Sequence, residues 1–213
     1  MKEVAILLGG PSITGFAKQK LIEFAKKMPV ICADGGANHA FSLGLTPTLI
    51  IGDNDSISAE ATKFYTKKQV EIITLAKKKT LTDDEAAVKM AMQRGASNIH
   101  AFGVFDGRID HMLANLCLLI NYGKKLENLS FYGENFIAYY CGHELEFFGK
   151  EGDLVSIIPF SPKIKKVYLE GMAYSLEGQD LFFGSTRGNS NILLEPRGRI
   201  HHEGGNLLVI HYF

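Results

Sequence analysis

The stretch VICADGGANHAFSLGLTPTLIIGDND, residues 30–55, contains two short apolar runs that both end in glycine and aspartate. Asp34 and a glycine pair follow Val30–Ala33, and Gly52 and Asp53 follow Thr48–Ile51. Short apolar runs bounded by turn residues predict strands buried on both faces of a sheet. Because open α/β sheets bind ligands at the carboxyl ends of their strands, this stretch also predicts where a site lies.

Strand and helix signals alternate on both sides of this stretch. Further apolar runs predict strands at Val4–Leu8, Val70–Ile73, Ile99–Gly103 and Leu129–Tyr132. Helical spacing of apolar residues predicts helices over Phe16–Lys27, Thr82–Arg94 and Asp110–Tyr122. Strands that alternate with helices of about 10–15 residues are typical of parallel βαβ units. We therefore predict an α/β domain over residues 1–135.

The pattern changes after Asn135, where no stretch has a convincing helical period. Short β-like runs follow at Ala138–Tyr140, Leu145–Phe148, Asp153–Pro159, Lys166–Leu169, Ser190–Leu194 and Asn206–Tyr212, separated by turn residues. Several short strands with frequent turns favour an antiparallel sandwich or barrel. The sequence therefore predicts a second, all-β domain over residues 136–213.

Composition excludes several classes of protein. The 213 residues contain 23 Lys and Arg against 23 Asp and Glu, so no basic field would attract nucleic acid or an anionic membrane. The apolar run at the N-terminus is too short for a membrane span. The three cysteines, Cys32, Cys117 and Cys141, form no C-x-x-C pair, which predicts reduced, buried thiols in a cytoplasmic protein.

Acidic and glycine-rich segments gather at the predicted strand ends. Asp53 and Asp55 place two carboxylates close together, which suits Mg²⁺. A structural turn or an exposed acidic loop would show the same residues. The glycine pair after Asp34 offers backbone N–H groups to phosphate, or simply makes a tight turn in which Asp34 caps a helix.

Two helix starts carry further candidates. Thr82 and Glu85 form a capping box, which accounts for both residues and leaves Asp83 as a candidate metal ligand. Arg108, the residue type for bidentate phosphate binding, precedes Asp110 and His111, which could equally be a cap and a surface residue. Together the segments predict a Mg²⁺-dependent phosphate-transfer site.

Common alternatives are absent from the sequence. There is no P-loop motif, no G-x-G-x-x-G after the first strand and no zinc spacing among the histidines. We interpret His201 and His202 as an exposed hairpin.

The motifs together resemble those of bacterial thiamine pyrophosphokinases. The matching segments of the first part are DGGAN at 34–38, GDxDS at 52–56, TDxE at 82–85 and GRxDH at 107–111. The second part adds DLVSIIPF at 153–160, GMAYSL at 171–176 and GNSN at 188–191. The resemblance covers nearly the whole chain.

The resemblance implies a Rossmann-like parallel α/β/α sandwich that binds ATP and Mg²⁺, followed by a smaller antiparallel β-sandwich that binds thiamine. It implies transfer of the diphosphoryl group of ATP to the thiamine hydroxyl, giving AMP and thiamine diphosphate. It also implies a homodimer with active sites at the subunit interface. No nucleic-acid or membrane partner is expected.

Carried onto this sequence, the family's site residues fall into groups that share a role. Metal ligands would be Asp53, Asp55 and Asp83. Catalytic residues would be Asp55, Asp83, Arg108 and Asp110, the last lying by the reacting groups as a candidate acceptor of the hydroxyl proton. The nucleotide site would contain Asp34, Gly35, Gly36, Asn38, Lys79, Arg108 and His111. Thiamine would contact Tyr174, Ser190 and Asn191.

The chain departs from the family at Thr80, where the family usually has aspartate, and it has no Trp to stack on thiamine. Three alternatives therefore stay open. A related diphosphokinase could act on a hydroxymethylpterin. The protein could be a non-catalytic thiamine or nucleotide sensor, the alternative that Thr80 favours. A structural metal-binding module would leave Arg108 and the glycine turns unused.

Overall fold

The computed structural model describes residues 2–10, 13–78, 80–105 and 108–213. The chain forms two compact units, which we describe separately. The first unit runs to Leu118 and includes Leu126–Glu134; the second comprises Leu119–Lys125 and Asn135–Phe213. Within the described residues no helix is long and apolar enough to cross a membrane.

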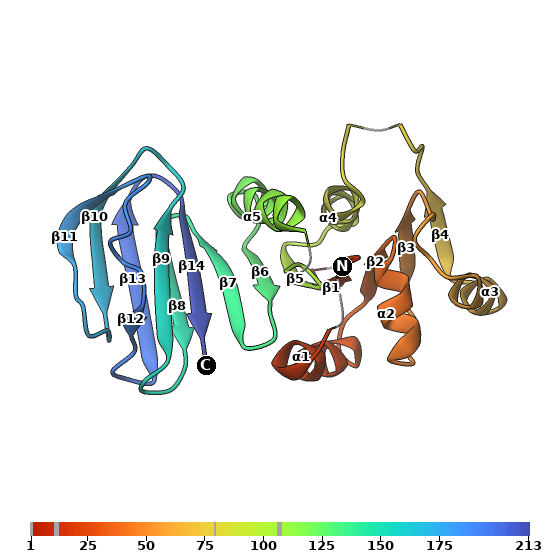
Figure 1. The fold of residues 1–213 in the computed structure, drawn as a ribbon, viewed down its shortest axis with the longest axis horizontal. Helices are drawn as coiled ribbons and strands as arrows, with labels where there is room; N and C mark the ends of the chain where they lie inside the picture. The colour runs from red at the N-terminus through yellow and green to blue at the C-terminus, as the bar shows by residue number, and fades with distance from the viewer. Residues whose placement is uncertain (1, 11–12, 79, 106–107) are drawn as a thin grey trace. The chain divides into compact units, whose positions relative to one another are not determined.

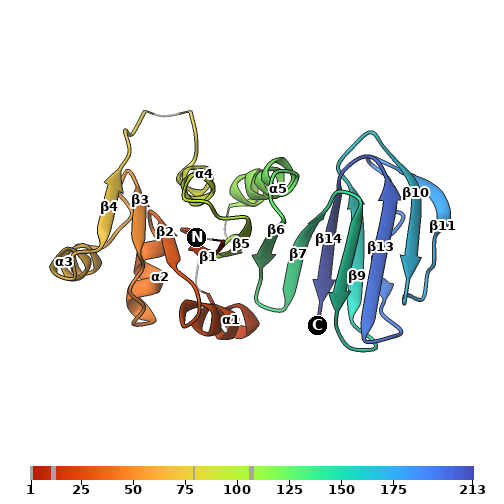
Figure 2. The same cartoon turned by 180° about the vertical axis from the view of Figure 1, so that it is seen from behind.

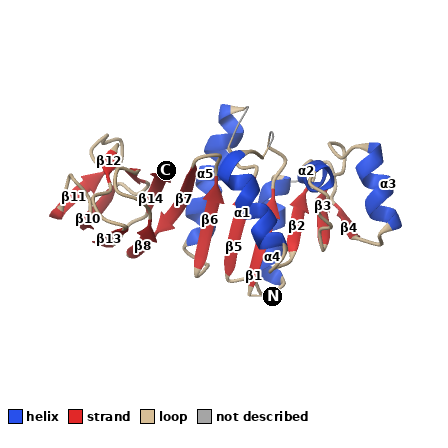
Figure 3. Ribbon diagram, turned by 90° about the horizontal axis from the view of Figure 1, so that it is seen from below, coloured by secondary structure: helices blue, strands red, loops and turns tan. Residues whose placement is uncertain are grey.

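A parallel sheet forms the centre of the first unit (Figures 1 and 3). Its strands are β1 (Glu3–Leu7), β2 (Val30–Ala33), β3 (Leu49–Gly52), β4 (Glu71–Thr74), β5 (Asn98–Phe102) and β6 (Asn128–Tyr132). Neighbouring strands follow the order β6-β5-β1-β2-β3-β4. The chain therefore proceeds outward from β1 to β4 and then returns to place β5 on the other side of β1. This reversal makes the gap between β1 and β5 a topological switch point.

Helices cover both faces of this sheet. They are α1 (Gly15–Ala25), α2 (Gly36–Ser42), α3 (Ala59–Lys67), α4 (Asp83–Gln93) and α5 (Ile109–Gly123). In Figures 1 and 2, α4 lies on one face of the sheet, and α1 and α2 lie on the other. Strands β2 and β3 are buried along their whole length, as expected for strands covered on both faces.

The helical spacing of apolar residues did not predict α2 and α3. Helix α2 has seven residues and begins at a glycine pair, so it is too short to show a helical period and opens with a residue type that disfavours helix. Helix α3 is mostly polar and is started by Ser58, whose hydroxyl accepts a hydrogen bond from Ala61 N at 3.1 Å. That cap was the available signal.

The second unit contains two sets of antiparallel strands, which form its two layers of sheet. Strands β7 (Phe136–Cys141), β9 (Leu154–Pro159), β12 (Asn191–Ile192) and β14 (Leu207–Tyr212) form one; β8 (Glu144–Phe148), β10 (Lys163–Glu170), β11 (Glu177–Phe182) and β13 (Arg197–Glu203) form the other. Side chains from both sheets share one buried core, which includes Val155 and Val209 from the first and Val167 and Ile200 from the second. The mixed α/β part followed by an antiparallel β part confirms the coarse fold prediction.

Two local predictions were wrong. His201 and His202 lie in β13, not in an exposed hairpin, and His202 is only 5% exposed, with its Nε2 atom 3.3 Å from Cys141 O at the end of β7. Cys117 is exposed, whereas Cys32 and Cys141 are buried. The apolar residues next to Cys117 in the sequence lie on other faces of α5. An apolar run in a helix therefore does not show that each of its residues is buried.

Candidate active site

A pocket of about 450 Å³ lies in the first unit at the carboxyl ends of β1 and β5, the switch point of the sheet. Its lining residues come from the ends of the strands and the starts of the helices: Gly9, Gly10, Ala33, Asp34, Ser56, Thr82, Asp83, Asp84, Gly103, Val104, Arg108, His111 and Asn115. This is the place at which an open α/β sheet binds its ligand.

Glycine backbone forms one side of the pocket. Gly10 N donates a hydrogen bond to Gly103 O at 3.1 Å, and a Cβ on Gly10 would lie 2.1 Å from that oxygen. The loops after β1 and β5 therefore lie backbone to backbone, which only glycine permits at this point. Sequence reasoning missed Gly9 and Gly10 because it compared them only with the dinucleotide fingerprint. The available signal was a glycine pair at the end of the first strand.

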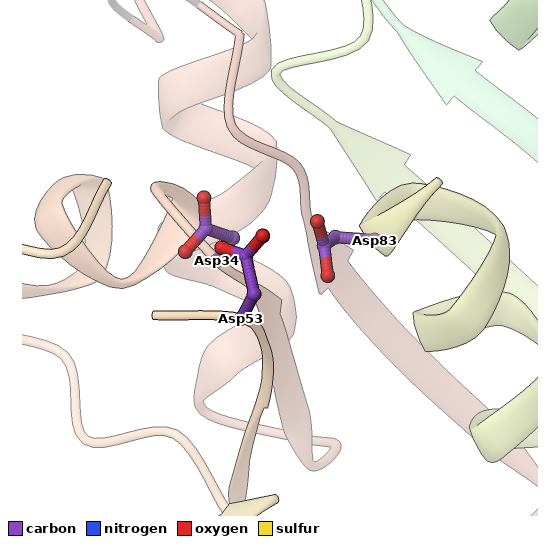
Figure 4. Close-up of side chains that lie close together, drawn as sticks. All are labelled: Asp34, Asp53 and Asp83. Carbon is purple, nitrogen blue, oxygen red and sulfur yellow. The ribbon is translucent and has the colours of Figure 1, made fainter. Parts of the chain in front are cut away.

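Three carboxylates converge beside this pocket. Asp34 follows β2, Asp53 follows β3, and Asp83 opens α4. One oxygen of each lies within 4.8 Å of the others, and all three residues are half-buried. In Figure 4, Asp34 and Asp53 lie next to each other, and Asp83 faces them from the first turn of its helix. Like charges this close are costly unless a cation neutralises them.

The local structure of Asp34 shows that it does not cap a helix. The N-cap of α2 is Gly35, and no side chain caps that helix. Asp34 has a φ of 39°, in the left-handed region, and its Oδ1 atom is buried with no hydrogen-bond partner among the described residues. A buried, unsatisfied carboxylate oxygen beside two further carboxylates fits a hard cation such as Mg²⁺.

Asp55 lies outside this group of three. Its side chain is half exposed, with Oδ2 3.4 Å from Lys77 Nζ. A hydrogen bond from Ser56, and to a smaller extent one from Lys77, holds the pKa of Asp55 below its usual range. The sequence predicted that Asp53, Asp55 and Asp83 would lie together. In the structure Asp34, not Asp55, lies with Asp53 and Asp83. Asp55 instead lies beside Lys77.

The loop that carries Asp53 is held by Asn38. Asn38 Nδ2 donates to Ser56 O at 2.8 Å, and its Oδ1 accepts from Ser58 N at 2.9 Å. Both ends of the amide therefore bind loop backbone, and Asn38 is not among the described residues that line the pocket. Gly36 also has a packing reason, because a Cβ there would lie 2.2 Å from Leu7 O.

The start of α4 combines a cap with two acids. Thr82 Oγ1 accepts from Glu85 N at 3.1 Å, which confirms the predicted cap. Asp84 lines the pocket, and burial raises its pKa to about 6, against the opposing effect of a hydrogen bond with Asn115. The sequence analysis did not place Asp84 in the site. The signal was an acid in the first turn that the capping box does not need.

Arg108 and Asp110 form a two-point ion pair on the surface. Arg108 Nε donates to Asp110 Oδ1 at 3.1 Å, and Nη2 donates to Oδ2. The pair lowers the pKa of Asp110 to about 2, which makes this carboxylate a weak base. Arg108 and His111 line the pocket. Thr80 is exposed, and the predicted nucleotide residue Lys79 lies outside the described residues.

A second pocket, of about 290 Å³, lies in the β unit. Its described lining includes Tyr174 and Asn191, two of the residues predicted to contact thiamine. Tyr174 is 66% exposed. Ser190, the third, has a φ of 55° and donates its backbone N–H to Ser156 Oγ at 3.1 Å.

Two family descriptions match consecutive parts of the chain. The thiamin pyrophosphokinase catalytic domain matches residues 20–131, and the thiamin pyrophosphokinase vitamin B1 binding domain matches residues 142–207. The first match ends before Glu134 and the second begins after Asn135, one of the points at which the chain passes from one compact unit to the other.

Similar proteins carry the same description. Thiamine pyrophosphokinase of Bacillus subtilis is 28% identical over 99% of this chain and 98% of its own length. Thiamine pyrophosphokinase 1 of rice is 25% identical over 80% of this chain and 74% of its own. A crystal structure of the Bacillus subtilis protein superposes with a TM-score of 0.88, at 26% identity and over 99% of both chains. That of thiamin pyrophosphokinase from Candida albicans shares the fold, with a TM-score of 0.84, 17% identity and coverage of 100% of this chain and 89% of its own. The chain described here belongs to the thiamin pyrophosphokinase family.

Proposed function

We propose that this protein transfers the diphosphoryl group of ATP to the hydroxyl of thiamine and releases AMP. The observation that carries the proposal is the convergence of Asp34, Asp53 and Asp83 beside a glycine-floored pocket at the switch point of the sheet, in a chain of this family. Carboxylates at that position suit a metal–triphosphate complex rather than a bare anion.

The three carboxylates are the residues proposed to hold Mg²⁺. Their oxygens are the hard ligands that this ion prefers, and the buried, unsatisfied Oδ1 of Asp34 is an atom that a cation would satisfy. When bound, the ion would neutralise charge on the triphosphate. That Asp55 is a metal ligand stays a prediction. To bind the ion, its carboxylate would first have to break its ion pair with Lys77.

The chain's own groups position the reactants. Gly9 and Gly10 line the pocket without a side chain, and Arg108 supplies a planar two-point donor for phosphate oxygens. Asp110 occupies that donor in this structure, so we propose that phosphate displaces it. While the pair is intact, its low pKa makes Asp110 a poor acceptor for the hydroxyl proton. The proposed part of Asp110 is therefore to hold Arg108 in place before phosphate displaces it.

The β unit is the proposed thiamine-binding part. Its support is the match of residues 142–207 to the vitamin B1 binding domain and a pocket whose lining includes the exposed Tyr174. We also propose the domain limits 1–135 and 136–213, the Rossmann-like and β-sandwich classes, and a homodimer with active sites at the subunit interface. A cytoplasmic location stays a prediction.

A substrate comparison tests the proposed function. Purified protein is incubated with ATP and Mg²⁺, and with thiamine, a hydroxymethylpterin or no acceptor, and AMP is measured. We expect AMP only with thiamine. AMP only with the pterin would favour the related diphosphokinase. Thiamine binding without turnover would favour the sensor that exposed Thr80 suggests. Asp83→Asn should abolish AMP release, while the matched change Asp180→Asn, far along the chain in β11, should not.

A further inference from the structure

The side-chain amide of Asn191 is hydrogen-bonded inside the protein. The residue begins β12 and is 1% exposed. Its Oδ1 accepts hydrogen bonds from Tyr174 N and from Ile192 N, both at 2.9 Å. Its Nδ2 donates to Tyr174 O at 2.8 Å. The amide therefore binds both backbone groups of Tyr174 at once.

These bonds leave little capacity for a ligand. A side-chain amide oxygen has two lone pairs, and both are used here. One N–H of Asn191 is not used in these bonds, but the residue is almost fully buried. Asn191 thus lines the second pocket without an oxygen to offer, which argues against the direct thiamine contact that the sequence motif predicts.

The segment that Asn191 holds carries an exposed aromatic ring. Tyr174 follows a turn at Gly171 and precedes β11, and the neighbouring Ala173 N donates to Ile192 O at 2.9 Å. Met172 and Leu193 form an isolated bridge beside it. The backbone of Tyr174 is thus tied to β12, while the residue is 66% exposed and lines the second pocket.

We propose that Asn191 is a positioning residue, which fixes the Tyr174 ring as the wall against which an aromatic ring of the substrate stacks. The inference rests on the proposed function, because it takes thiamine as the ligand of this pocket. Stacking contributes more when the partner ring is held near one place, and a backbone held at both its N–H and C=O fixes the point from which the Tyr174 ring extends.

Binding measured in two backgrounds tests the proposal. Calorimetry gives the thiamine Kd of the full-length wild type, Asn191→Ala, Tyr174→Ala and the double variant. Loss of an aromatic pair corresponds to about tenfold, so each single change should weaken binding by about that factor. In the Tyr174→Ala background, Asn191→Ala should weaken binding by less than about twofold, because no ring remains to be misplaced.

Stability supplies an independent readout. The bonds of Asn191 reach only backbone atoms, those of Tyr174 and Ile192, so Asn191→Ala should lower the melting temperature equally in both backgrounds. Asn191→Asp keeps the shape and the two accepted bonds but loses the donated one. We expect it to bind thiamine with an intermediate Kd, and it replaces the alanine variant if that variant fails to fold.

Asn206→Ala is the matched control. This amide also joins chain segments in the β unit, accepting from Tyr140 Oη and donating to Ser161 Oγ, both at 2.9 Å, and it is not among the described residues of the second pocket. We expect a lower melting temperature and an unchanged thiamine Kd.

The outcomes separate the two hypotheses. Additive losses in the double variant would make Asn191 a direct ligand and overturn the proposal. An unchanged Kd in Asn191→Ala would reduce it to a structural residue and overturn it as well. A wild type that does not bind thiamine would instead contradict the proposed function.

Discussion

Asp34→Asn should make the metal-free protein more stable, although it alters the proposed active site. The change removes one of three negative charges and keeps the shape of the side chain. Asparagine tolerates the left-handed backbone that Asp34 adopts, with its φ of 39°, so no strain is added.

The size of the effect follows from the spacing of the carboxylates. At the 4.8 Å limit within which these oxygens lie, two unit charges repel by about 3 kcal/mol for an effective dielectric constant of about 20. The residues are half-buried and salt screens them, so we expect a gain of about 1 kcal/mol. For a protein of this size that corresponds to a rise of about 2–4 °C in melting temperature.

Thermal melting with and without Mg²⁺ measures this. The wild type should gain stability as Mg²⁺ is added, by about 2.7 kcal/mol at a hundred times the Kd, and Asp34→Asn should gain far less. The control Asp180→Asn removes a carboxylate that lies 2.6 Å from Lys163, so it should be neutral or destabilising. A metal-free Asp34→Asn protein that melts below the wild type would refute the reasoning about the three carboxylates.

Three further predictions concern single positions. Arg108→Ala should raise the pKa of Asp110 from about 2 toward its ordinary range, as seen by NMR titration of the carboxyl group. Because the folded pKa is depressed, stability from this pair is present above the ordinary pKa and is lost as pH falls toward 2; an unchanged pKa would contradict the pairing. Gly36→Ala should cost more than about 2 kcal/mol in denaturant unfolding, since its Cβ would meet a backbone carbonyl of β1 at 2.2 Å, whereas Gly44→Ala, with nothing within 4 Å, should cost about 1 kcal/mol for its backbone strain alone. Thr80→Asp should leave turnover within about tenfold or raise it, because this exposed position needs no buried partner, and complete loss would show that the loop depends on threonine.

The regular part of the fold was readable from the sequence because burial leaves a local trace. Strands β2 and β3 are apolar throughout and end in glycine or aspartate, so their limits could be predicted within a residue. Strand β13 left no such trace. Ile200 is the only large apolar residue in its sequence, RGRIHHE, and pairing with β8 and β10 makes β13 a central strand.

The chemistry of the site was predictable from the sequence, but the set of residues that form it was not. Aspartates at strand ends indicated a cation site, and Asp53 and Asp83 do converge. Which third carboxylate joins them depends on the turn after β2, where left-handed Asp34 directs its side chain toward the other two. Likewise, Asn38 and Asn191 belong to motifs that suggest ligands, yet in both the amide binds neighbouring backbone, which only coordinates can show.

The fate of the ATP phosphorus atoms tests the central claim most directly. ATP radiolabelled at the β-phosphorus is incubated with the protein, Mg²⁺ and thiamine, and the products are separated. Transfer of the diphosphoryl unit in one step predicts that all transferred label appears in thiamine diphosphate, with unlabelled AMP formed in equal amount. Label left in ADP, with thiamine monophosphate as the other product, would contradict the account.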